Sequence, residues 1–260
     1  MRITPANLIA HRELIVMLVV RNLKIRYKNS ALGFFWTLLG PLFLILIYTL
    51  FLGIMRFNVD LPLLITGILV WQFLAMCTGD SLHAIVGNAN LVKKTAFPRI
   101  ILVLSTVLAN GVNFLLSLLV LCVYLFIVHT TPGLGVWFPI ALLSQFALCL
   151  GLSLILSAAN VFFRDAEHIL GTSMTAWFFL TPVIYPLSIL QPLFESRPWL
   201  QAVYFLNPMA GIVAAYRSLF LGTPTGPLPL LFLSFAVAWG LLLAGWSLFQ
   251  RVERRFAEVL

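Results

Sequence analysis

The sequence has little charge and carries no ionisable residue inside its long apolar runs. Only 9% of its 260 residues are charged, against 62% that are hydrophobic, and the mean hydropathy is +1.05. So little polar surface excludes a soluble globule of this length. Charged residues within membrane spans usually mark ion pathways. Their absence argues against proton- or sodium-coupled transport.

The usual residues of enzyme active sites are also missing. No lysine follows a glycine, so the phosphate-binding loop that ends in Gly-Lys-Ser or Gly-Lys-Thr is absent. Asp165, Glu167 and His168 form the one dense polar cluster, and we expect Asp165 to cap a helix there rather than to bind a metal. The three cysteines lie in apolar runs and offer no disulfide framework. We therefore expect no catalytic residue, metal or cofactor in this chain, and any energy for transport must come from a partner.

Six apolar runs are each near or above the ~20 residues that cross the hydrocarbon core of a membrane. They are Ala31–Met55, Leu61–Gly79, Ile100–Val128, Val136–Phe163, a stretch beginning near Ile169, and Leu228–Gln250. The runs must be helices, because lipid offers no partner to exposed backbone groups. The sequence thus predicts an all-α polytopic membrane protein with six transmembrane helices, in a single domain over residues 1–260.

The basic residues predict the orientation of these helices. Cytoplasmic loops carry the excess of Lys and Arg, and alternate threading puts thirteen of the sixteen on one side: Arg2, Arg12, Arg21, Lys24, Arg26, Lys28, Lys93, Lys94, Arg99, Arg164, Arg251, Arg254 and Arg255. Both termini are then cytoplasmic. A seventh span through Leu200–Tyr216 would move the basic C-terminal tail outside, and Asn207-Pro208 interrupts it. The net charge of +8 flanks the spans, so it favours anionic headgroups over nucleic acid.

Three segments outside the spans have distinct patterns. In the arm, residues 1–30, Leu14 and Leu18 recur at helical spacing, as do Arg21, Lys24 and Lys28, which predicts an interfacial amphipathic helix. This helix either only anchors the topology or places Arg21, Lys24, Arg26 and Lys28 where the phosphate of a lipid-linked substrate enters.

The other two segments lie on opposite sides. Residues 80–99 predict either a short cytoplasmic helix that an attached protein can push or a basic loop on headgroups. Residues 188–227 are apolar but rich in proline, which predicts two half-length helices, roughly Trp199–Phe205 and Met209–Phe220, that dip from the outer face. They either narrow an exit or cover the spans as a lid.

Neutral polar groups and aromatic rings are the remaining features of the spans. Thr37, Asn110, Asn113 and Ser117 are expected to form hydrogen bonds between helices. Most of the rings are expected to pack or to lie at the membrane interface. The others can line a pore over which a sugar polymer slides, because flat rings offer apolar faces with few hydrogen-bonding commitments.

Five sequence strings carry a resemblance to a known family. They are RNLKIRYKNSALGFFWTLLGPLF (21–43), NANLVKKTAFPRIIL (88–102), FFRDAEHI (162–169), WFFLTPVIYPLSIL (177–190) and LNPMAGIVAAYRSLFLG (206–222). In these strings and their order the chain resembles the membrane subunit of bacterial ABC transporters that export O-antigen, capsular polysaccharide or teichoic acid.

This resemblance implies a homodimer in the bacterial inner membrane, bound to two copies of a cytoplasmic ATPase that holds ATP and Mg, with a lipid-linked glycan as substrate. It implies ATPase coupling through the region of His83, Asn88, Lys93, Lys94 and Arg99. It also implies a channel at the dimer seam formed by the first and fifth spans, with Trp36, Trp177, Phe178 and Tyr185 as candidate lining residues. A drug or lipid exporter of the same architecture is the alternative, and a passive channel or membrane scaffold is a third.

Overall fold

The computed structural model describes residues 10–26, 28, 30, 32, 35–55, 60–94, 97–130, 137–163 and 165–260. Within these ranges every regular element is a helix. Arg2 and Arg164, which contribute to the predicted orientation, lie outside the described residues. The all-helical prediction is confirmed for the part of the chain that is described.

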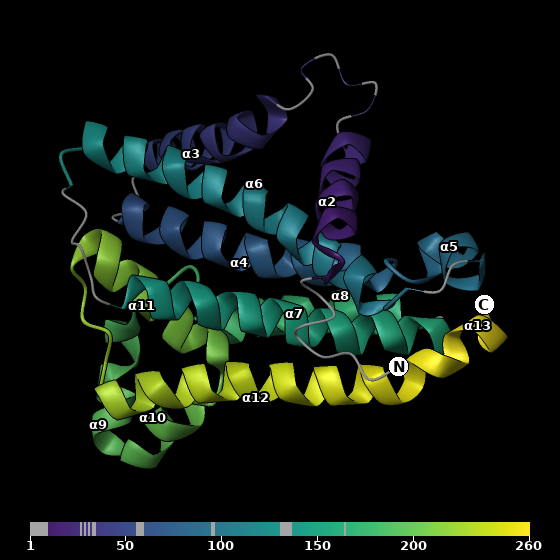
Figure 1. Ribbon diagram of the computed structural model, residues 1–260. Helices are drawn as coiled ribbons and strands as arrows, with labels where there is room; N and C mark the ends of the chain where they lie inside the picture. The colour runs from purple at the N-terminus through teal and green to yellow at the C-terminus, as the bar shows by residue number, and fades with distance from the viewer. Residues whose placement is uncertain are drawn as a thin grey trace.

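Five helices are long and apolar enough to cross a membrane: α3 (Trp36–Met55), α4 (Leu61–Leu82), α6 (Ile100–Ile127), α7 (Phe138–Phe162) and α12 (Leu228–Val252). They coincide with five of the six predicted runs. In Figure 1 they run side by side along one direction, with α3 on the outside of the bundle against α6. Most of α3 is exposed, whereas α4 and α7 form the buried centre.

The fifth predicted run forms α8 (Ala166–Leu180), which has 15 residues. At 1.5 Å per residue it is about 22 Å long, shorter than a full span. It lies antiparallel to α4, because Glu167 at its start is 3.8 Å from His83 and Trp177 near its end packs on Trp71. Asp165 stands at the N-cap position, but its side chain makes no capping hydrogen bond, so the expectation that it caps this helix is wrong.

Two groups of short elements lie at opposite ends of the bundle (Figure 1). One end, here called the α5 end, carries α2 (Arg12–Arg26), η2 (Val86–Asn88), α5 (Ala89–Lys94), η4 (Glu253–Arg255) and α13 (Phe256–Val259). The other, the α10 end, carries η3 (Leu187–Leu190), α9 (Gln191–Ser196), α10 (Pro198–Phe205) and α11 (Pro208–Leu221). Helix α2 crosses the direction of the long helices. The described basic residues of α2, α5 and the chain's last turns therefore gather at one end.

The two half-length helices predicted near residues 199–220 are present as α10 and α11. Asn207 caps α11, accepting a hydrogen bond from the backbone nitrogen of Met209 at 3.1 Å. Gly222 ends it in the left-handed conformation, with φ of +66°. This break at Asn207 rules out one continuous helix over Leu200–Tyr216. Helix α11 is nonetheless almost wholly buried, against α4, α7 and α12.

Helices α7 and α12 approach each other closely through two glycines. A Cβ added at Gly151 would lie 2.7 Å from backbone atoms of Leu241 and Leu242. Gly245 faces the backbone of Gly151 in the same way. Small residues allow such close backbone packing in membrane helices, where van der Waals contact replaces the hydrophobic effect as the main attraction.

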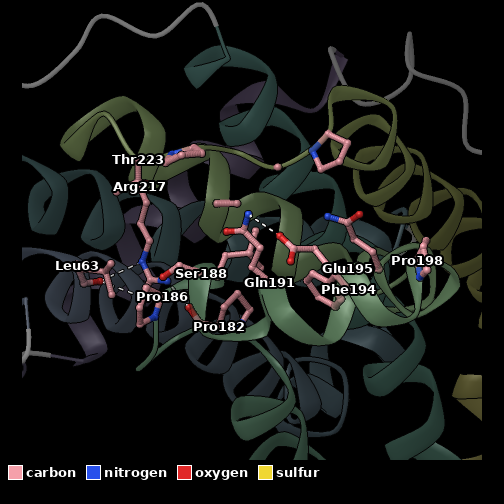
Figure 2. A pocket seen from close by; sticks show the side chains of 16 residues that line it. Leu63, Pro182, Pro186, Ser188, Gln191, Phe194, Glu195, Pro198, Arg217 and Thr223 are labelled. Carbon is pink, nitrogen blue, oxygen red and sulfur yellow. Dashed lines mark hydrogen bonds between the residues drawn. The ribbon is translucent and has the colours of Figure 1, made fainter.

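Arg217 of α11 is the most deeply buried charged side chain in the described chain, at 3% exposure. Its Nε and Nη2 donate to the carbonyl oxygen of Leu63, at 3.1 and 3.0 Å. Its Nη groups also donate to the carbonyl oxygens of Pro182, Val183 and Tyr185 at 2.6–2.9 Å. The guanidinium thus joins α11, the start of α4 and the turn after α8 (Figure 2). All five of its N–H groups are used, so it acts as a structural connector.

We expect Gly151→Ala to lower the unfolding temperature of the purified chain. Alanine normally stabilises a helix by ~1 kcal/mol relative to glycine, but here the added methyl overpacks a backbone contact at a cost of about 1–3 kcal/mol. Gly240→Ala in α12 is the matched control, because open space surrounds that position. Equal unfolding temperatures for the two variants would contradict the close approach of α7 and α12.

Arg217→Met is expected to destabilise the α10 end. It leaves four backbone carbonyls without their donor, and each unpaired buried carbonyl costs at least about 1 kcal/mol. Thermal unfolding together with limited proteolysis near residues 182–227 measures the effect. Arg197→Met is the control, since Arg197 is an exposed arginine of the same region. Comparable behaviour of the two methionine variants would show that the five hydrogen bonds do not hold this end together.

Candidate functional site

The predicted coupling residues divide into outward-facing and inward-facing groups at the α5 end. Lys93 and Lys94 are exposed on α5, which is anchored beneath by the buried Val92. His83 is also exposed, 3.8 Å from Glu167 of α8. These three side chains form the accessible part of the segment.

Asn88 and Arg99 instead tie the segment to the rest of the subunit. The Asn88 side chain accepts a hydrogen bond from Arg21 Nη2 at 2.9 Å and donates one to the carbonyl of Ala84 at 2.8 Å. Arg99 donates to the backbone carbonyl of Glu253, beside the C-terminal turn. These contacts connect the segment over 80–99 to α2 and to the turn that follows α12.

The cationic arm divides in a similar way. Arg21, Lys24 and Lys28 line a shallow groove on α2 together with the apolar residues Met17, Val20 and Ile25. Positive charge next to exposed apolar side chains matches the boundary between headgroups and acyl chains.

Arg26 points elsewhere, toward α4 and α6. It pairs with Asp80 and donates to Asn110 Oδ1 at 2.7 Å. Asn110 in turn donates to Asp80 Oδ2 at 2.9 Å. Because its charge is paired, Arg26 differs from the other three arm residues named as a phosphate site.

Two of the four candidate channel residues pack inside the subunit. Trp177 and Phe178 meet Trp71 edge to face, with ring centroids 5.8 and 5.5 Å apart. Trp177 Nε1 also donates to Asn207 Oδ1 at 2.8 Å. Trp36, by contrast, is exposed at the start of α3. The structure therefore brings these four residues to different places.

Tyr185 belongs to a small phenol pair after the end of α8. Its hydroxyl lies 3.2 Å from the hydroxyl of Tyr204 and donates to the carbonyl of Phe179 at 3.3 Å. Burial raises the pKa of Tyr204, and the hydrogen bond with Tyr185 raises it further. The hydrogen bond between the two hydroxyls joins the turn after α8 to α10.

The sequence interpretation missed a polar face on α8. Gly171, Thr172, Ser173 and Thr175 are exposed there, on a helix in a membrane protein. The two threonine hydroxyls donate to backbone carbonyls of their own helix, at 3.1 and 3.0 Å. Their oxygens remain available as acceptors. The string GTSMT was the available signal, since it places three small hydroxyl residues within four positions of an apolar stretch.

Two cavities complete the candidate site. A cavity of about 630 Å³ opens at the α10 end, between η3, α9, α11 and the loop before α12. Figure 2 shows Arg217 directed toward Leu63 on one side of it, and Gln191 joined to Glu195 by a hydrogen bond of 3.3 Å on the other. A second cavity, of about 170 Å³, lies between α3, α4 and α6, and both Arg26 and Trp36 line it. One arm residue and one candidate channel residue thus meet at this cavity, whereas the others lie elsewhere.

Comparison with known proteins identifies the family. Residues 13–221 match the ABC-2 type transporter family. The chain is 35% identical over 257 residues to "O-antigen export system permease protein RfbA" of Klebsiella pneumoniae, covering 95% of both chains. It is 38% identical over 256 residues to the protein of the same name from Myxococcus xanthus, covering 97% of both. The matched region contains nearly all of α2 and the elements through α11, with the α5 segment and the cavity between α3, α4 and α6. The chain therefore belongs to the ABC-2 type transporter family as a membrane permease subunit.

Proposed function

We propose that this chain is the transmembrane subunit of an ATP-driven exporter that moves lipid-linked polysaccharide from the cytoplasmic to the outer face of the bacterial inner membrane. The observation that carries the proposal is the similarity, over nearly the whole chain, to permeases named for O-antigen export. The bundle supports this proposal, because the five described spans carry charged side chains only near their α5 ends, at Asp80 of α4 and Arg251 of α12. Charged residues that form ion pathways usually lie within the spans.

The orientation follows from charge. The α5 end carries the basic residues and faces the cytoplasm, and the α10 end faces outward. Helix α8 then makes the sixth crossing, completed by the turn over 181–186, and both termini are cytoplasmic. α10 and α11 dip from the outer face as re-entrant helices.

The partners are a second copy of this chain and two copies of a cytoplasmic ATPase, which binds ATP and Mg. The ATPase seats on the α5 end, where His83, Lys93 and Lys94 are exposed. Asn88 and Arg99 pass its movement to α2 and α12. Closure of the ATPase dimer opens a path between the two permease copies, and the glycan threads outward along the polar face of α8.

The lipid pyrophosphate enters past the α2 groove. Lys24 and Lys28 are exposed beside apolar side chains, so they meet an anionic headgroup while its acyl or prenyl part stays in lipid. Arg26 has a different role from Lys24 and Lys28, because it holds α2 to the spans through its ion pair with Asp80.

Depletion of this chain is expected to remove surface polysaccharide and to trap finished lipid-linked polymer inside the cell. The measurement is the glycan content of surface and interior fractions. Normal surface glycan would rule out the polysaccharide assignment and favour a small amphiphile or lipid as cargo.

A tagged chain purified gently from its native membranes should also bring an ATPase with it, whereas a passive channel or scaffold would purify alone.

Combined Lys24→Glu and Lys28→Glu substitution is expected to reduce export severalfold with normal membrane insertion, because the groove would then repel a phosphate. Arg12→Glu is the matched control, an exposed arginine of the same helix outside the groove. Arg26→Glu should instead lower the amount of folded protein, since it places two carboxylates together. Unchanged export in the double variant would contradict a role of Lys24 and Lys28 in binding the phosphate.

A further inference from the structure

The cavity between α3, α4 and α6 has a polar lining inside the transmembrane bundle. Gln72 of α4 is exposed at its wall, halfway along the helix, and Asn110 and Asn113 of α6 stand beside it. Such amides in membrane helices normally bond across a helix interface. Asn110 does so, donating to Asp80 and to the carbonyl of Met76 on α4. Gln72 and Asn113 line an open volume of about 170 Å³.

Asn113 has no partner although it is deeply buried. The residue is 6% exposed, and both its side-chain oxygen and nitrogen are buried without a hydrogen bond. Burying an unpaired amide is unfavourable, and most buried polar atoms in proteins find a partner. The side chain lines the cavity. A molecule in the cavity that both donates and accepts hydrogen bonds would satisfy it.

The charge balance of the cavity disfavours an anion. Arg26 is its one cationic lining residue, and that guanidinium is paired with Asp80 and hydrogen-bonded to Asn110. A phosphate would have to compete with the Asp80 carboxylate for the same donors. The polar groups of the remaining lining include neutral amides and the hydroxyl of Ser117. This hydroxyl donates to the backbone carbonyl of Asn113 and can still accept a hydrogen bond.

Aromatic rings line the same cavity, together with Thr37 and apolar residues that include Leu69 and Met76. Phe73 and Phe114 stack on each other with centroids 4.5 Å apart, and Trp36 is 46% exposed at the mouth. Amides that bond hydroxyl groups, set beside flat apolar ring faces, suit a molecule with hydroxyls at its edges and C–H groups on its faces. That description fits a polyol.

We propose that this cavity binds a neutral polyol, either a sugar ring of the transported glycan or the glycerol headgroup of a membrane lipid. Asn113 supplies the inner hydrogen bonds, Gln72 the outer ones, and Trp36 covers the mouth. The sugar assignment rests on the proposed export function, and the binding itself does not. The cavity shares Arg26 with the arm, so a sugar held here would lie close to the groove that receives the phosphate.

The first test separates binding from folding. Asn113→Leu removes an unpartnered buried amide, so its unfolding temperature is expected to stay unchanged or to rise, while export falls at least tenfold. Gln72→Leu at the exposed wall should also reduce export. This second variant still tests the cavity if Asn113→Leu folds poorly. Val112→Leu, its neighbour on α6 outside the cavity lining, is the matched control. Wild-type export by both cavity variants would overturn a role in transport.

The second test identifies the occupant in the permease–ATPase complex held in lipid nanodiscs. A cysteine introduced by Gln72→Cys is labelled with a small polar thiol reagent, and the wild-type chain with Cys77, Cys122 and Cys149 is the blank. Labelling slowed at least threefold by millimolar glucose, galactose or mannose assigns a sugar. Labelling slowed only in phosphatidylglycerol bilayers, relative to phosphatidylethanolamine, assigns a glycerol headgroup.

Unchanged labelling under every condition would overturn the proposal, because the cavity would then hold only water. The labelling result does not depend on export. If depletion of the chain left surface glycan normal while labelling was still slowed, the proposed function would fail and the polyol site would stand.

Discussion

The arrangement of the α10 end depends on one buried guanidinium. Arg217 brings its charge into an apolar environment, and the carbonyls of four residues from two other segments converge on it. Gly67 lies so close to Arg217 and Val183 that a side chain there would displace them. Backbone that is not helical survives at membrane depth only when its polar groups find partners. Arg217 supplies them for the turn over 182–185, which allows α8 to end early and α9–α11 to fold back.

A second polar contact plays the same part near the α5 end. Arg26, Asp80 and Asn110 link the arm to two central helices, so the position of α2 is set from inside the bundle. This fixes which arm charges are available to a ligand. Lys24 and Lys28 remain exposed because neighbouring Arg26 satisfies the only carboxylate of α4. One sequence cluster of cations thus contains both a connector and a binding surface.

The sequence predicted what depends on local composition. Five runs became long helices, and prolines with Asn207-Pro208 predicted the break between α10 and α11. It did not predict what depends on tertiary contacts. Arg217 lies in the half-length helix predicted near Met209–Phe220, but nothing local indicates which carbonyls will surround it. Trp177 and Phe178 were proposed to line a channel, but only the position of Trp71 on α4 decides that their rings face inward. The inward and outward sides of α8 follow from its packing, not from its residues alone.

Helix α8 is the element that touches both ends. At its start Glu167 lies 3.8 Å from His83 beside the α5 segment, and at its end Trp177 donates a hydrogen bond to Asn207 at the junction of α10 and α11. Asn207 also donates to Thr181 Oγ1 at 2.9 Å, so this junction is held to the last residues of α8 twice. A helix of 15 residues moves nearly as a rigid rod over such a length. Through these contacts one short helix connects the α5 end to the junction of α10 and α11. Because Trp177 and Phe178 also pack on Trp71, a displacement of α8 must involve α4 as well.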